Sequence, residues 1–237
     1  MTRGTRRAGA LGTALLAALL LVGCASGGSG GSGGDVLPSD QAVPTGTEGA
    51  AHFDDYALVT GEGSIDVQLW FDLRCPICQQ FEEAAGEQIA GLVDDGTITY
   101  SLHPMNFLDR VSAGTYYSSR AGSALTCVAV EDPDALLDAM QVLYEAQPEE
   151  GTEGLTNTEI NGVLEDGGIE GLGECVDEMP YTSWVQASND AALAGIEGAD
   201  VEAIQGTPTL IVNGTSYQGS VSDADAIIDF ITSGGQS

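Results

Sequence analysis

The sequence contains no lysine, and its basic side chains are six arginines and two histidines. Arg3, Arg6 and Arg7 lie in the first 24 residues, which contain no acid. The rest of the chain contains 36 acidic residues and three arginines, which gives it a net charge of about −33. Such a surface repels nucleic acids and anionic lipid headgroups, because binding them depends on basic side chains that neutralise phosphate. The composition therefore excludes nucleic-acid binding.

The chain also lacks an apolar run long enough to span a membrane. Ala8–Val22 has 15 residues, fewer than the roughly 20 that a spanning helix needs. This run follows the three arginines and ends in Leu21-Val22-Gly23-Cys24, which resembles the lipobox of bacterial lipoproteins. We expect residues 1–23 to be a signal peptide and Cys24 to be the lipid-carrying N-terminal residue. An ordinary signal peptide with an incidental cysteine is the alternative.

Residues 24–50 contain few large apolar side chains, and residues 27–34 are only glycine and serine. This composition predicts a flexible tether with a root-mean-square reach of roughly 25–30 Å. A reach of this size lifts a folded domain clear of a bilayer. The tether therefore indicates that the folded domain, residues 51–237, works on soluble or emerging partners near a membrane.

Two alternating segments flank a helical one in the first half of this domain. The odd-numbered residues from Ile65 to Phe71 are apolar and alternate with Asp66 and Gln68, which is the period of a strand. Apolar residues at 81–92 then recur at helical spacing. Pro76 falls in the first turn of this helix, where its missing N–H costs no hydrogen bond. A second alternating strand at 98–102 completes a βαβ unit.

The end of the chain predicts a hairpin and a last helix. Strand-forming residues at 209–212 and 215–217 are separated by Asn213-Gly214, the strongest short signal for a hairpin. Between the two halves, residues 111–198 have a mostly helical pattern. The expected helices of the second half of the chain are 112–130, 133–146, 158–164, 183–196 and 223–232. The sequence thus predicts an α/β fold whose sheet is split by a helical insertion.

Four cysteines remain after Cys24, and two of them form the motif Cys75-Pro76-Ile77-Cys78. The motif lies at a strand-to-helix junction, where backbone N–H groups and the helix dipole stabilise a thiolate at the first cysteine. Cys75 is therefore the candidate nucleophile. Cys78, one turn further along, can resolve a mixed disulfide by attacking Cys75. The pattern indicates thiol–disulfide exchange through a redox-active disulfide, with no other cofactor and no metal.

Two alternatives remain for the motif, namely a structural disulfide and a zinc site. A structural Cys75–Cys78 link would close a loop too short to constrain the chain, and a zinc site would need Cys127 and Cys175 as well. That second pair lacks the short spacing common in four-cysteine zinc sites. Because exported proteins favour disulfides, we expect a structural Cys127–Cys175 bridge, whose loop of about 48 residues stabilises by up to ~4 kcal/mol. A second redox relay pair is the alternative.

Three segments of the chain resemble the DsbA family of exported thioredoxin-fold oxidoreductases. They are residues 71–82, Leu102-His103-Pro104-Met105 and Gly206-Thr207-Pro208-Thr209, and the resemblance extends from about residue 55 to the C-terminus. It implies a thioredoxin fold with the helical insertion between its βαβ and ββα halves. It also implies a cis Thr207–Pro208 bond against the cysteine motif, where Thr207 and Pro208 offer backbone to an extended substrate segment. Pro76 and Ile77 would shape the same surface.

The chain departs from this family at functional positions. A buried acid six residues before the nucleophile would fall on Leu69, so the proton of the second cysteine must move through water or another group. Ile77 stands where the best-known members have a histidine, which removes one stabiliser of the thiolate. We expect Asp72 to be a solvated carboxylate and His103 to be a packed structural residue. Trp184 is expected in the core or at the surface, with a peptide groove as the alternative.

The motif, the signal and the resemblance together predict an exported, lipid-anchored oxidoreductase that forms or exchanges disulfides in exported proteins. By resemblance, its reoxidant is a quinone-linked membrane partner. One alternative is a reductase or isomerase fed by a membrane electron donor. Another is a thioredoxin-fold lipoprotein that binds partners without turnover, which the intact cysteine motif disfavours.

Overall fold

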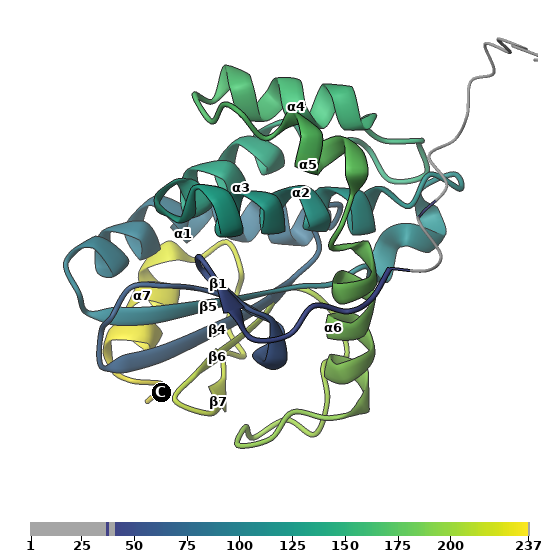
Figure 1. Ribbon diagram of the computed structural model, residues 1–237. Helices are drawn as coiled ribbons and strands as arrows, with labels where there is room; N and C mark the ends of the chain where they lie inside the picture. Colours follow the sequence, from purple (N-terminus) through teal and green to yellow (C-terminus); the bar gives the residue numbers. More distant parts are fainter. Residues whose placement is uncertain (1–36, 38–40, 237) are drawn as a thin grey trace, which may run out of the picture. The chain divides into compact units, whose positions relative to one another are not determined.

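The computed structural model describes residue 37 and residues 41–236. Seven strands in these residues form one sheet in the order β1-β2-β3-β5-β4-β6-β7 (Figure 1). The strands are β1 (Thr47–Glu48), β2 (Ala51–His52), β3 (Ala57–Thr60), β4 (Ile65–Phe71), β5 (Ile98–Pro104), β6 (Thr209–Val212) and β7 (Thr215–Ser216). The α-helices are α1 (Pro76–Asp94), α2 (Tyr117–Glu131), α3 (Leu136–Glu145), α4 (Asn157–Asp166), α5 (Gly173–Glu178), α6 (Thr182–Ala194) and α7 (Ala224–Thr232).

Strand β4 is the central strand from which the cysteine motif emerges. It pairs in parallel with β5 and antiparallel with β6. Its odd-numbered residues join the main core with α1 and α7, whereas Trp70 packs on the other face with Ala192 of α6 and Ile211 of β6. Both faces of β4 are therefore buried at its C-terminal end, where Trp70 and Phe71 lie. This double burial fixes the end of the strand, where the chain turns into α1.

The helices α2 to α6 form an insertion between β5 and β6 (Figure 1). Helix α2 is buried on all sides from Tyr117 to Ala129 and contacts α3, α4, α5 and α6. Small residues along α2, which are serine, alanine and glycine, allow these close contacts. Helix α4 begins with a capping box, in which Thr156 and Glu159 each accept from the other's backbone N–H. The predicted α/β class, with a helical insertion between a βαβ and a ββα half, is confirmed.

The N-terminal edge of the domain differs from the expectation. The predicted tether 24–50 extends too far, because Thr47–Glu48 is strand β1 and pairs with β2. Gly49 makes the turn between them with φ of 54°, and it approaches the α2 backbone so closely that a Cβ would overlap the carbonyl of Ala129. Strands of two residues are too short to show any alternation. Their place in the sheet is therefore invisible in the sequence.

Two further expectations concern the N-terminal segment. The predicted signal peptide and Cys24 lie outside the described residues. Within the part of the chain that the structure does describe, no helix combines the length and apolarity needed to cross a bilayer.

Candidate active site

Cys75 and Cys78 lie where β4 leads into α1. Cys75 caps the helix in an extended conformation, and Pro76 is the first helical residue. Proline is suited to this position because the first N–H groups of a helix have no intrahelical partner. Cys75 is 7% exposed and Cys78 is 2% exposed, both as free thiols, while Ile77 between them is 43% exposed. Of the two sulfur atoms, that of Cys75 belongs to the more accessible residue.

The surroundings of Cys75 favour its thiolate. A hydrogen bond from the side chain of Cys78 is the main cause that lowers the pKa of Cys75 to about 6. Burial opposes this shift, while Thr207 and the backbone N–H groups of Ile77 and Cys78 add to it. As a thiol, Cys75 instead donates to the carbonyl oxygen of Thr207, 3.3 Å away. The N–H groups at the N-terminus of α1 thus add to the stabilisation of negative charge on this sulfur.

Cys78 has the opposite electrostatics. Burial raises the pKa of the Cys78 thiol well above its ordinary value, and the neighbouring Cys75 raises it further. Cys78 therefore keeps its proton when Cys75 is ionised. The two thiols differ sharply in acidity although they are one helical turn apart.

We expect the reduced protein to show a thiolate absorbance that titrates with a midpoint near pH 6, as Cys75 ionises. Since this pKa is depressed from the ordinary 9.0, ionisation stabilises the reduced fold fully above about pH 9, and the contribution is lost as the pH falls through about 6. Ultraviolet absorbance and the alkylation rate, followed against pH, measure both effects. Cys78→Ala should raise the midpoint by removing the donor. A signal that survives in Cys75→Ser would contradict the assignment.

The bond between Thr207 and Pro208 is cis. Strand β6 begins at the next residue, and its pairing with β4 fixes this turn beside the start of α1. The contact between Cys75 and Thr207 joins positions that are 132 residues apart in the sequence. The structure thus brings the motif and the expected substrate-binding turn together.

Asp72 is fully buried, so the expected solvated carboxylate is wrong. One carboxylate oxygen accepts from the backbone N–H of Arg74 at 2.8 Å, and the other from that of Leu108 at 2.9 Å. Burial raises the pKa of Asp72 to about 7, against the lowering effect of these hydrogen bonds. The carboxylate therefore ties the turn before Cys75 to the short 3-10 helix Phe107–Val111. It is a positioning group for the motif.

The loop after α3 forms a second support for the motif, which the sequence analysis missed. The fully buried Arg74 donates from Nη2 to the carbonyl oxygens of Glu149 and Thr152, each at 2.7 Å. Gln147 donates to the carbonyls of Leu73 at 2.9 Å and Cys75 at 3.1 Å. The loop thereby fixes the backbone on which the nucleophile sits. The sequence did contain one signal for this support, which is an arginine directly before Cys75 in a chain with few basic residues.

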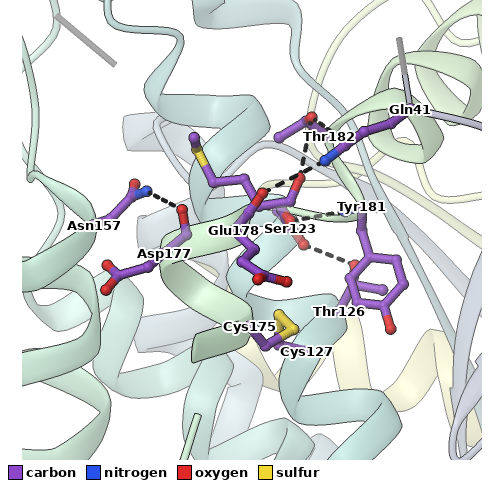
Figure 2. The surroundings of a disulfide bond; sticks show 12 residues. Gln41, Ser123, Thr126, Cys127, Asn157, Cys175, Asp177, Glu178, Tyr181 and Thr182 are labelled. Atoms are coloured by element: carbon purple, nitrogen blue, oxygen red, sulfur yellow. Dashed lines mark hydrogen bonds between the residues drawn. A yellow bond between two sulfur atoms is a disulfide. The ribbon is translucent and has the colours of Figure 1, made fainter. Parts of the chain in front are cut away.

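A disulfide joins Cys127 of α2 to Cys175 of α5, with their Cα atoms 6.1 Å apart (Figure 2). Nearby, Ser123 of α2 accepts from the backbone N–H of Tyr181, and Asn157 donates to the carbonyl of Asp177. The zinc alternative required both Cys127 and Cys175 as ligands of one metal with the motif. Bonded to each other, they cannot complete such a site.

His103 and Trp184 both have packing roles. The Nδ1 atom of His103 lies 2.9 Å from the carbonyl oxygen of Tyr56, and its ring stacks on Trp70. Burial lowers the pKa of His103 to about 4, so the imidazole is neutral at physiological pH. Trp184 is fully buried and donates to the carbonyl of Phe53 at 3.0 Å. The peptide-groove alternative for Trp184 is therefore wrong.

Comparisons with known proteins agree with this geometry. A family model described as thioredoxin matches residues 59–229, most of the described chain. The chain belongs to the thioredoxin family. Its match includes the cysteine motif, the insertion and the cis turn. A search of curated proteins found no significant match.

Solved structures place this thioredoxin-family chain among its DsbA-like members. The reduced disulfide bond oxidoreductase DsbG of Mycobacterium tuberculosis is 25% identical with a TM-score of 0.64, over 76% of this chain and 88% of that one. Oxidised DsbA of the same organism is 26% identical with a TM-score of 0.62, over 74% and 92%. BdbD of Bacillus subtilis, 22% identical with a TM-score of 0.60 over 82% and 100%, shares the fold.

Proposed function

We propose that the chain is a thiol–disulfide oxidoreductase that passes the disulfide of Cys75 and Cys78 to cysteine-containing exported proteins. The observation that carries this proposal is the opposite acidity of the two thiols at the N-terminus of α1. A substrate thiolate attacks the Cys75 sulfur, and the bond to Cys78 breaks. A second substrate thiolate then attacks the mixed disulfide, and Cys75 leaves as its stabilised thiolate. The substrate is oxidised by two electrons, and the motif is reduced.

The same observation favours disulfide donation over reduction. Every interaction that lowers the pKa of Cys75 stabilises the reduced motif relative to its disulfide. A disulfide whose reduced form is stabilised is an oxidant, because its reduction lowers the free energy. The reductase alternative uses the same atoms but requires a motif that gives up electrons readily.

Thr207 and Pro208 supply the surface for the substrate in this proposal. The carbonyl of Thr207 faces Cys75, and strand β6 fixes the turn. An extended substrate segment would pair with this backbone while its cysteine meets Cys75. The exposed Ile77 and the adjacent Pro76 would border that segment on the helix side.

The membrane context completes the proposal. Cys24 would carry the lipid, residues from Cys24 to the start of the sheet would act as the tether, and the domain would work on the outer face of the membrane. A quinone-linked membrane protein would reoxidise Cys75 and Cys78. The cycle needs no cofactor beyond this dithiol, since the reduced dithiol holds both electrons taken from the substrate until it is reoxidised.

Mixing the oxidised chain with a reduced, unfolded protein that has two cysteines tests the function. We expect the substrate to gain one disulfide for each motif that becomes reduced, as counted by alkylation and mass spectrometry. Transfer should be fast at neutral pH because Cys75 is a good leaving group. A chain that reduces an oxidised substrate but leaves a reduced one unchanged would overturn disulfide donation.

A further inference from the structure

Opening and closing the disulfide requires a group that exchanges a proton with Cys78. The chain has no carboxyl at the position where related folds have one. That position is Leu69, an apolar core residue with 1% exposure. When the disulfide opens, Cys78 leaves as a thiolate inside the core, where burial raises its pKa well above the ordinary value. Cys78 must therefore gain a proton in this direction and lose it when the disulfide reforms.

Glu82 lies one helical turn after Cys78 on α1, and residues four apart share a helix face. Its side chain is half-buried, and its carboxylate lies over Gly86. A Cβ at residue 86 would overlap this carboxylate, so glycine leaves room for it. Glu82 is thus directed along the buried side of α1.

Two cavities meet at Glu82. The inner one has a volume of about 30 Å³ and is also lined by Tyr100 of β5 and Met140 of α3. Since a water needs roughly 10–15 Å³ of such volume, the inner cavity has room for water. The outer one, about 260 Å³, is lined by Glu82 together with the exposed Glu83 and Glu145. Glu82 therefore lies between solvent and the interior.

Tyr100 lines the same cavity as Glu82 and belongs to the same core cluster as Cys78. Among the described residues, its hydroxyl is buried and has no hydrogen-bond partner. Burial, and then the charges of Glu82 and Cys78, raise the pKa of Tyr100 well above its ordinary value. The hydroxyl of Tyr144 is instead directed to the carbonyl of Asp72 at 3.4 Å. A hydroxyl can accept from one group and donate to another, which a relay requires.

We infer that Glu82 is the acid–base group that exchanges the proton of Cys78 with solvent, through the Tyr100 hydroxyl and water in the inner cavity. The inference rests on the proposed function. When a thiolate attacks Cys75, the electron pair of the broken S–S bond goes to Cys78, and the Glu82 carboxyl supplies the proton for that sulfur. The carboxylate regains a proton from solvent in the outer cavity. The reverse transfer accompanies reoxidation.

The acidity of Glu82 suits this exchange. Burial raises the pKa of Glu82 to about 7, so the acid and its conjugate base coexist at neutral pH. An acid–base group works best when its pKa lies near the operating pH. The titratable groups around the two cavities and the relay are Glu83 and Glu87 of α1, Asp138, Tyr144 and Glu145 of α3, Tyr100 of β5 and Cys78.

Glu82→Gln tests this role through reduction of the purified, oxidised protein by dithiothreitol at a series of pH values. We expect the wild type to react about 10²-fold faster than Glu82→Gln at low pH, where Glu82 carries its proton. This ratio should decline as the pH rises through about 7, because the donor ionises. Tyr100→Phe should lower the rate in the same pH range, and Glu82→Asp should restore part of it.

Asp94→Asn is the matched control, because it makes the same carboxyl-to-amide change at the exposed far end of α1. Its rates should equal those of the wild type at every pH. A ratio near one for Glu82→Gln, or a lowered ratio that does not change with pH, would overturn the inference. Dithiothreitol reports on the motif alone, so a wild type that fails to oxidise a protein substrate would contradict the proposed function without affecting this test.

Discussion

Replacing Cys78 with alanine should convert the chain into a trap for its substrates, whereas replacing Cys75 should abolish exchange. In Cys78→Ala the accessible, acidic thiol of Cys75 remains and can form a mixed disulfide. The thiol that would resolve this bond from inside the motif is gone. In Cys75→Ala the remaining thiol is 2% exposed and holds its proton, so it offers neither access nor a thiolate.

The two variants separate the roles by a simple measurement. Each is mixed with an oxidised or partly oxidised substrate protein, and disulfide-linked species are counted on non-reducing gels. We expect abundant mixed disulfides with Cys78→Ala and none with Cys75→Ala, together with a loss of turnover of at least about 10³-fold in both. Equal trapping by the two variants, or turnover that survives in Cys75→Ala, would refute the assignment of Cys75 as nucleophile.

The elements around the motif could be predicted because their patterns are local. Alternation at 65–71, helical spacing at 81–92 and Asn213-Gly214 each specify one element without reference to the rest of the chain. In the hairpin, both Asn213 and Gly214 have positive φ, as the tight turn requires. Helix α5 was missed because six residues carry too little periodicity, and the packing on α2 that positions it is tertiary.

The supports of the site could not be predicted, because they come from segments distant in sequence. Asp72 reads as a strand-end carboxylate, and its burial depends on the N–H of Leu108, 36 residues later. Arg74 bonds to Glu149 and Gln147 bonds to Leu73, partners that are 75 and 74 residues apart in the chain. In the sequence, Glu82 cannot be distinguished from the other acidic residues of its helix. A cavity and a buried tyrosine distinguish it, and neither has a signature in the local sequence.

Removing the Cys127–Cys175 bridge should have the largest effect on stability. The bond closes a loop of 48 residues, for which the loss of chain entropy in the unfolded state is worth about 4 kcal/mol. It also holds α5, whose six residues are too few for a stable helix by themselves. We expect Cys127→Ala/Cys175→Ala to lower the free energy of unfolding by about 4 kcal/mol and Tm by roughly 8–16 °C. Denaturant and thermal unfolding measure these changes.

The same double variant decides between a structural bridge and a redox relay. Cys127 is fully buried, so no partner reaches its sulfur while the fold is intact. Below its lowered Tm, Cys127→Ala/Cys175→Ala should therefore keep its rate of disulfide transfer. The matched control, Cys75→Ala/Cys78→Ala, removes a pair only three positions apart and should retain most of the stability while losing all transfer. A double variant at 127 and 175 that unfolds like the wild type but no longer transfers its disulfide would instead make this bridge a relay.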